Sequence, residues 1–268
     1  MLLPDKVTQM FIFITAASII RYFVIAGIAY LVWYILLKNK VSSKKIQLKF
    51  PKTTDYQREV FHSMLTFLIF GIVGVALYNT KVRPYTLTYY KIADYGWSYF
   101  ILSFFLTLII HDTYFYWMHR LMHHPKLYKY FHKVHHQSTN PSPWTSFSFQ
   151  PLEGIVEAGI FVIFAFLLPL HPTMILLFLL FMTTYNVYGH LGYEILPAHT
   201  NKHWFGRWFN TSVAHNMHHK YSVKNYGLWT TIWDRMCGTL HPQYDAVYEK
   251  TTVKKHESYA DLKEVSVQ

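Results

Sequence analysis

The fold of this chain is decided by a histidine-rich stretch that follows a long apolar run. From His111 to His136 it reads HDTYFYWMHRLMHHPKLYKYFHKVHH, and a related cluster, HNMHH, occupies positions 215–219. Residues three or four apart are neighbours on one face of a helix. The spacing therefore predicts three short helical segments that each present imidazoles on one side. These are His119 and His123, then His132, His135 and His136, and finally His215, His218 and His219.

The three segments supply eight imidazoles for metal binding. Neutral imidazole is a common ligand of zinc, copper, iron and nickel. One mononuclear site takes about three or four protein ligands, so eight predict two metal ions. A lone H-x-x-x-H arises often by chance, and a single histidine near a membrane is usually structural. Two copies of H-x-x-H-H beside one H-x-x-x-H-H are a far more specific pattern.

The composition indicates a membrane protein. Of the 268 residues, 52% are hydrophobic and only 15% are charged, which is typical of chains with apolar membrane spans. The net charge is +11 with histidine neutral. The basic residues flank apolar runs instead of forming a stripe, so we interpret them as positive-inside topology and expect no nucleic-acid partner.

Five apolar runs are candidates to cross or enter the bilayer. They lie at 11–37, 60–78, 96–110, 151–170 and 172–188. The basic loop between Lys38 and Arg58 is expected in the cytoplasm. We therefore predict an all-α, multi-pass integral membrane protein with about four or five apolar helices and a cytosolic histidine-rich metal-binding cap. Arg21 interrupts the first run, and we expect a helix that starts near residue 15, from which this side chain reaches the outer surface.

The chain divides into three regions. Residues 1–94 form an N-terminal transmembrane region with two spans and the basic cytosolic loop. Residues 95–242 form the catalytic domain, which includes a membrane helical hairpin at 151–188. Residues 243–268 form a polar C-terminal tail, which we expect to be loosely ordered from Thr251 onward.

An all-histidine site in a membrane chain favours redox chemistry over hydrolysis. Iron activates O₂, and side chains alone cannot supply the oxidant that cleaves an unactivated hydrocarbon C–H bond. A membrane zinc hydrolase is the alternative, but such sites typically mix carboxylates with histidine, and H-E-x-x-H is absent. A metal-binding or metal-transport protein is a further alternative. Transporters place ionisable groups near the bilayer midplane, whereas these histidines lie at span ends.

The sequence also indicates an external source of electrons. It has no G-x-G-x-x-G fingerprint and no P-loop, so no nucleotide-cofactor site of its own is evident. Each O₂ turnover needs two outside electrons. We therefore expect a separate electron-transfer partner, and the basic cap would attract an acidic one. The same lysines would equally serve to contact anionic lipid.

These motifs resemble those of the fatty acid hydroxylase/sterol desaturase superfamily. The resemblance covers roughly residues 95–242, from the histidine clusters to the segment NYGLWTTIWDRMCGT at 225–239. It implies a membrane-bound lipid hydroxylase or desaturase that acts on a sterol, sphingoid or fatty-acyl lipid in lipid biosynthesis. It further implies two iron ions held by histidines, O₂ as co-substrate, and electrons from cytochrome b5 or from a ferredoxin with its reductase. The motifs do not choose between hydroxylation and desaturation.

The resemblance also assigns ligands. His119 and His123 match the first ligand pair, and the two H-x-x-H-H clusters match the second and third sets. His190 matches an additional ligand histidine at the end of the last span. His111 matches a histidine that is a ligand or lies just behind the ligands. Glu194 replaces a further histidine found in some members and is a candidate carboxylate ligand or an acceptor behind the ligands. Apart from the resemblance, the candidates for orienting ligand N–H groups are Asp112, Glu153, Glu157 and Asp234. For Asp234 the favoured alternative is an ion pair with Arg235 or Arg120, or a turn cap.

Overall fold

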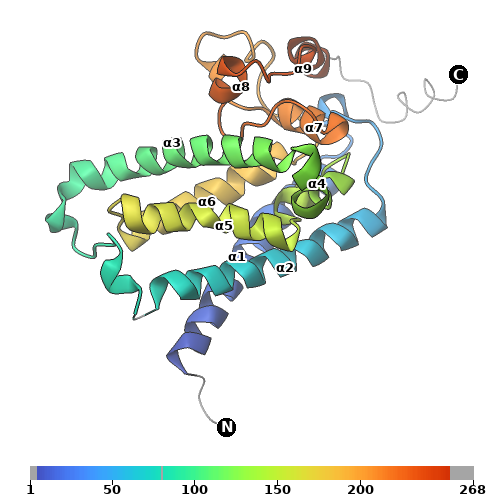
Figure 1. The fold of residues 1–268 in the computed structure, drawn as a ribbon. Helices are drawn as coiled ribbons and strands as arrows, with labels where there is room; N and C mark the ends of the chain where they lie inside the picture. The colour runs from blue at the N-terminus through green and yellow to red at the C-terminus, as the bar shows by residue number, and fades with distance from the viewer. Residues whose placement is uncertain (1–4, 80, 254–268) are drawn as a thin grey trace, which may run out of the picture.

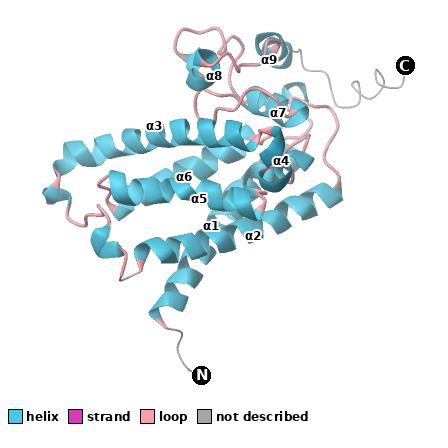
Figure 2. Cartoon of the chain, viewed as in Figure 1, coloured by secondary structure: helices cyan, strands magenta, loops and turns pink. Residues whose placement is uncertain are grey.

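The computed structural model describes residues 5–79 and 81–253, and every regular element within those ranges is helical. Long helices lie side by side, and short helices gather beside them (Figures 1 and 2). The long helices are α1 (Lys6–Tyr30, continued by a π-helical turn at Leu31–Leu36), α2 (Thr53–Tyr78), α3 (Gly96–Met122), α5 (Pro151–Leu167) and α6 (Pro172–Gly189). The short ones are α4 (Pro125–Phe131), α7 (Ser212–Tyr221), α8 (Ile232–Met236) and α9 (Tyr244–Thr252). The all-α prediction is confirmed.

Four of these helical segments are long and apolar enough to cross a membrane. They are Lys6–Leu36, Thr53–Tyr78, Gly96–Met122 and Pro172–Gly189, within the predicted range of about four or five apolar helices. The fifth apolar helix, α5, has 17 residues and is joined to α6 by residues 168–171. It contacts α2 and α3, whereas α6 contacts α1 and α3. Phe161 and Phe164 of α5 meet Phe178 of α6 across the space between them.

Local signals explain where the long helices begin. The Asp5 carboxylate accepts a hydrogen bond from the backbone N–H of Thr8 at 2.7 Å and caps α1, as short polar side chains do at helix starts. Asp55 caps α2 by accepting from the Lys52 backbone N–H at 2.9 Å. Helices α5 and α6 each begin with proline, whose fixed φ suits the first helical position. Each of these helices therefore has at its start a residue that accepts from an unpaired backbone N–H group or, in the case of proline, lacks that group.

The bundle is held by an aromatic core rather than by water exclusion alone. Tyr22, Phe67, Phe147, Phe164 and Phe178 are almost fully buried at its centre. Large apolar side chains also remain exposed along the outer faces of all five long helices, which is the pattern of surfaces that meet lipid tails. Because lipid tails are as apolar as these side chains, close packing between helices supplies the stability.

Arg21 does not reach the outer surface, and that prediction is wrong. The Asp5 cap starts α1 at Lys6, so Arg21 lies midway along the helix. Its Nε donates to the hydroxyl of Thr183 on α6 at 2.9 Å. The helix begins about nine residues earlier than we expected, because the polar residues from Lys6 to Gln9 are themselves helical. Arg21 therefore stays among the helices.

The basic loop between α1 and α2 folds against the segment that follows α6. Lys45 is fully buried, and its Nζ donates to the Gly192 carbonyl at 3.2 Å. The ammonium lies 4.9 Å from the centre of the Tyr193 ring, a cation–π distance. Burial lowers the pKa of Lys45 to about 7. Lys45 thus ties the loop to the segment after α6 instead of facing water.

The C-terminal region is partly helical. Helix α9 packs on α7, where Tyr244 and Tyr248 are buried against Val213 and Met217. The expected polar tail therefore begins with an ordered helix. The remainder of that tail, residues 254–268, lies outside the described residues.

We expect Gly192→Ala to destabilise the protein more than Gly96→Ala. Both glycines have positive φ, 71° and 77°, so alanine would cost each about 1 kcal/mol in backbone strain. A methyl at Gly192 would also lie 2.7 Å from the Tyr34 hydroxyl and 3.1 Å from the Pro141 carbonyl oxygen, whereas nothing lies within 4 Å at Gly96. Unfolding midpoints in detergent should fall by several degrees more for Gly192→Ala. Equal midpoints would show that the contact beside Gly192 is loose.

Candidate metal centre

The predicted histidines come from five separate places in the fold. His119 lies in the last turn of α3 and His123 ends that helix. His132 ends α4, and His135 and His136 occupy a 3₁₀ turn just beyond it. His190 follows α6 directly. The last three, His215, His218 and His219, lie on α7.

These nine histidines form two groups. In the first, the ligand atoms of all members lie within 4.8 Å of one another, and the members are His119, His123, His132, His136 and His218. In the second, the same limit holds for His135, His190, His215 and His219. Residues four apart stay together in one group, while the histidine three after the first member of each H-x-x-H-H cluster crosses to the other group. The motifs therefore connect the two groups rather than each serving one.

The Nε2 atoms within each group converge on a shared point. In the first group, His119 and His132 bring theirs to 2.9 Å, and His123 and His218 to 3.1 Å. In the second group, the His190 Nε2 lies 2.9 Å from that of His215 and 3.1 Å from that of His219. Nitrogens bound at about 2.1 Å from one metal ion lie roughly 3 Å apart. The spacing fits a metal ion in each group.

The other ring nitrogens explain why the Nε2 atoms carry lone pairs. Carbonyl oxygens accept from the Nδ1 of His119 (Tyr226), His190 (Asn186), His218 (Lys224) and His219 (Ser138), at 2.7 to 3.0 Å. A carbonyl can only accept, so each Nδ1 carries the proton and each Nε2 is left unprotonated. Lone pairs facing one another at these distances repel, and a bound cation removes that repulsion.

Glu153 is the carboxylate that meets a ligand candidate. Its Oε1 lies 2.6 Å from the Nδ1 of His132, and both side chains are buried. Its Oε2 accepts from the Gln150 backbone N–H at 3.3 Å, which caps α5. The predicted role of Glu153 thus has a contact that supports it, since carboxylates behind metal-bound histidines fix the ring and raise its basicity. Glu157, one turn further along α5, lines a small buried chamber beside Phe149 and Asn186.

Asp112 and Asp234 act on backbone rather than on histidine rings. Asp112 accepts from the backbone N–H groups of Trp229 and Thr230 at 2.9 and 3.1 Å. Asp234 accepts from those of Tyr226 and Gly227 at 2.9 and 2.8 Å. This second contact fixes the loop whose Tyr226 carbonyl accepts from His119. Asp234 therefore supports the centre through Tyr226, and Asp112 fixes the next residues of the same loop.

Glu59 is a supporting residue that the sequence analysis missed. It is fully buried, and its two oxygens accept from the hydroxyls of Ser138 and Ser142 at 2.7 and 2.6 Å. The Ser138 carbonyl in turn accepts from His219 Nδ1. A carboxylate at the very edge of an apolar run was the available signal, because such groups are kept where they have partners.

Two predicted residues, His111 and Glu194, lie outside both groups, and so does the neighbouring His124. His111 is buried 5.1 Å, ring centre to ring centre, from both Trp229 and Phe178. Glu194 accepts from the Val213 and Leu196 backbone N–H groups, both at 3.0 Å, and so holds the start of α7. His124 caps α4 by accepting from the backbone N–H of Lys126. Glu194, at the position of a histidine in some relatives, thus supports α7, which carries three histidines of the two groups.

Burial keeps the clustered imidazoles neutral. It lowers the pKa of His136 to about 3 and that of His190 to about 4. It lowers the pKa of His132, His135, His215, His218 and His219 well below the usual value, and the neighbouring imidazoles lower each further. Because metal binding requires neutral imidazole, both groups are ready to bind a cation at neutral pH.

Comparison with known proteins gives a consistent family. A family model described as fatty acid hydroxylase matches residues 104–239, from within α3 to just after α8. A Delta(7)-sterol 5(6)-desaturase of Gibberella zeae is 30% identical over 208 residues, covering 76% of this chain and 63% of the relative. Lathosterol oxidase of Rattus norvegicus is 32% identical over 188 residues, covering 69% and 61%. No solved structure shows a significant match.

The chain spans less than two thirds of the length of these two relatives. The match nevertheless includes every histidine of the two groups, since these lie between positions 119 and 219. The resemblance stated from the motifs is therefore confirmed at the level of the superfamily.

We expect Glu153→Gln to weaken metal binding about 10- to 100-fold, the usual cost of losing a carboxylate behind a ligand histidine. Glu157→Gln is the matched control, because it makes the same change one turn away without touching a ligand candidate. Metal retained after dialysis against graded chelator concentrations, measured by elemental analysis, gives the comparison. Equal retention in both variants would remove Glu153 from the site.

We also expect metal-free protein to lose stability as the pH falls below about 6.5. The folded state keeps His136 and His190 neutral down to a pKa of about 3 and about 4, whereas the unfolded chain takes up protons near pH 6.5. The unfolded state therefore binds more protons in this window. Each of the two histidines then lowers the free energy of unfolding by about 1.4 kcal/mol per pH unit. Unfolding midpoints of chelator-treated protein between pH 7.5 and 5 test this, and a flat profile would contradict it.

Proposed function

Because this chain belongs to the fatty acid hydroxylase family, we propose that it is a membrane-bound, O₂-dependent oxidoreductase that cleaves a C–H bond of a lipid. Its metal centre would be two iron ions, held by the five-histidine and four-histidine groups. The observation that carries the proposal is the pair of adjoining groups with converging Nε2 atoms. Their rings meet across the boundary, where His136 and His219 stack with centres 4.9 Å apart.

The composition of the two groups supports oxidation over hydrolysis. Among the described residues, no carboxylate belongs to either group. Zinc hydrolases typically combine histidine with a carboxylate ligand or base. Bound iron would supply O₂ activation, which no side chain can provide. The chain's own contribution is to keep Nε2 unprotonated and aimed inward where an acceptor lies behind Nδ1, as it does for His119, His132, His190, His218 and His219.

We further propose a sterol as the substrate class. The relatives are named for oxidising sterols, one at the 5(6) position and one as lathosterol oxidase. Desaturation removes two hydrogen atoms from adjacent carbons while O₂ becomes two waters. The substrate gives two of the four electrons that this reduction needs. The other two must come from a donor protein, for which cytochrome b5 or a ferredoxin with its reductase are the candidates.

The arrangement of the helices supports a cytosolic centre and a multi-pass topology. The basic loop folds against the chain just after His190, since the Glu194 backbone N–H donates to the Lys44 carbonyl at 3.0 Å. The loop and the histidines therefore lie at the same end of the bundle. Basic loops mark the cytoplasmic side of membrane proteins. An electron donor would then reach the centre from the cytosol.

We expect purified protein to bind about two irons per chain and to consume O₂ when a reductant and a Delta(7)-sterol are supplied. His218→Ala and His215→Ala each remove one member of a different group, so each should lower the iron content by about one and abolish sterol oxidation. His199→Ala is the control, because that side chain lies outside both groups and is largely exposed. Iron content, O₂ uptake and mass spectrometry of the sterol are the measurements.

Other outcomes would redirect the assignment. Two zinc ions that resist replacement by iron, with no O₂ uptake, would favour a hydrolase. Iron binding with oxidation of a fatty acyl chain but not of a sterol would keep the reaction and reject the substrate class. Full activity of His218→Ala would show that the five-histidine group is not the centre.

A further inference from the structure

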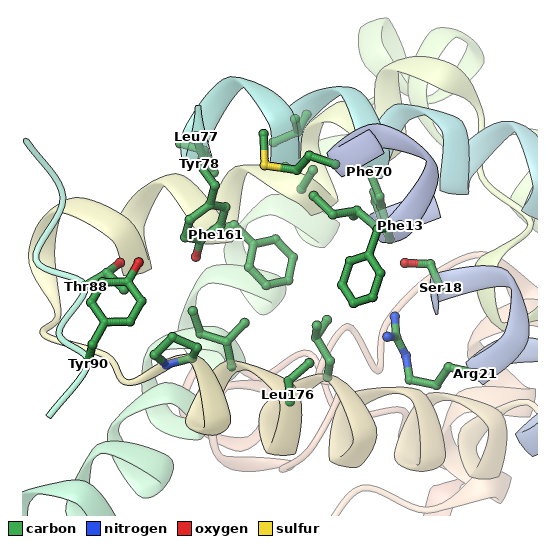
Figure 3. Close-up of a pocket in the computed structure, with 18 residues that line it drawn as sticks. Phe13, Ser18, Arg21, Phe70, Leu77, Tyr78, Thr88, Tyr90, Phe161 and Leu176 are labelled. Atoms are coloured by element: carbon green, nitrogen blue, oxygen red, sulfur yellow. The ribbon is translucent and has the colours of Figure 1, made fainter. Parts of the chain in front are cut away.

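A cavity of about 440 Å³ lies among α1, α2, α5 and α6. Its walls are almost entirely apolar, and polar side chains occur at its two ends (Figure 3). Tyr78, Thr88 and Tyr90 lie at one end, and Ser18 and Arg21 lie at the other. An elongated apolar space with polar ends fits a lipid that carries one small polar group.

Arg21 brings an unneutralised charge to this cavity. No acidic side chain lines the space, and the described ion pairs do not include Arg21. A guanidinium has five N–H donors, and the described hydrogen bonds of Arg21 use its Nε, on Thr183. Charged groups inside a membrane are expensive and mark ligand sites when they face a cavity. The cavity therefore suits a ligand with an oxygen that accepts hydrogen bonds.

The end that holds Arg21 is the end nearer the histidines. On α6 the lining residues run from Pro172 to Leu179, and Thr183, the partner of Arg21, lies beyond them toward His190. Thr183 and His190 are seven positions apart, which corresponds to roughly 10 Å along a helix. Tyr78, at the other end of the cavity, is the last residue of α2. The charged end thus points toward the metal centre.

Phe70 and Phe161 connect the cavity to that centre. Both line the cavity, and both also line the small inner chamber beside Phe149 and Asn186. The Phe149 ring lies 5.3 Å, centre to centre, from that of His135. The Asn186 carbonyl accepts from His190 Nδ1 at 2.7 Å. The chamber therefore lies between the cavity and the four-histidine group, with the two phenylalanines at the boundary.

We propose that this cavity binds the sterol substrate and that Arg21 receives its hydroxyl group. This inference rests on the proposed function for the substrate class. A sterol has one hydroxyl on an otherwise hydrocarbon skeleton, which matches a charge at one end of an apolar space. Its ring carbons 5 and 6 lie only a few bonds from the hydroxyl-bearing carbon. A hydroxyl held by Arg21 therefore leaves those carbons at the end nearer the histidines, with the side chain toward Tyr78 and Tyr90.

Binding of tritiated lathosterol to metal-free protein in detergent tests the role of Arg21. We expect Arg21→Met to weaken binding about tenfold or more, because hydrogen bonds to charged groups contribute about 1.5–3 kcal/mol. Arg21→Lys should restore part of that affinity, since it returns a charged donor. Unfolding midpoints show whether each variant is folded. Wild-type affinity in folded Arg21→Met would overturn the proposal.

Two adjacent leucines on α6 test the cavity itself. Leu176 lines the cavity on its outward-facing side, where it is 64% exposed, whereas Leu177 lines a separate groove with Ile101 and Phe105. Leu176→Trp should therefore weaken lathosterol binding, and Leu177→Trp should bind like wild type. Equal binding by the two variants would show that the sterol lies elsewhere.

A second ligand and a parallel activity measurement separate the possible failures. Palmitic acid also offers an oxygen acceptor, and palmitate binding that needs Arg21 without lathosterol binding would overturn the sterol assignment. Sterol oxidation by iron-loaded wild-type protein is measured alongside. Oxidation with Arg21-independent binding would reject this inference alone, whereas Arg21-dependent binding without oxidation would reject the proposed reaction and keep the site.

Discussion

The repulsion between inward-facing imidazole lone pairs is the constraint on which this structure depends. Nine rings are brought together in a buried space, and several Nε2 atoms approach within about 3 Å. The carbonyls of Tyr226, Lys224 and Ser138 and the carboxylate of Glu153 hold four of these rings from behind, those of His119, His218, His219 and His132. Much of the chain outside the membrane therefore serves to position acceptors behind the rings.

That requirement explains which parts could be predicted from the sequence. Spacing of four residues places two imidazoles one turn apart wherever the chain is locally helical, so the pairs at 119/123, 132/136 and 215/219 are local features. The long apolar runs are local features too, and the all-α fold and the spans could therefore be predicted from them. The crossing of His135 and His218 to the opposite groups depends on how α4 and α7 face each other. No single segment carries that information.

The supporting carboxylates were harder to predict for the same reason. Glu153 lies at the start of a helix and could be named as a candidate, but its contact with His132 joins two segments. Glu59 acts through Ser138, from a helix far away in the sequence, and it was missed. Arg21 was placed wrongly because a charged side chain in an apolar run either reaches the membrane surface or finds a polar partner inside the protein. The partner of Arg21 is Thr183, 162 positions later in the sequence.

The contacts of Arg21 and Glu59 show how charge is distributed between the two halves of the bundle. Glu59 is satisfied by two serine hydroxyls at the end that carries the histidines, and its role is complete within the protein. Arg21 shares one donor with Thr183 and faces an apolar space. A buried carboxylate with full hydrogen bonding stabilises a structure, whereas a cation with donors left over prepares a site. The same physical rule therefore gives Glu59 a structural role and gives Arg21 a role in binding a ligand.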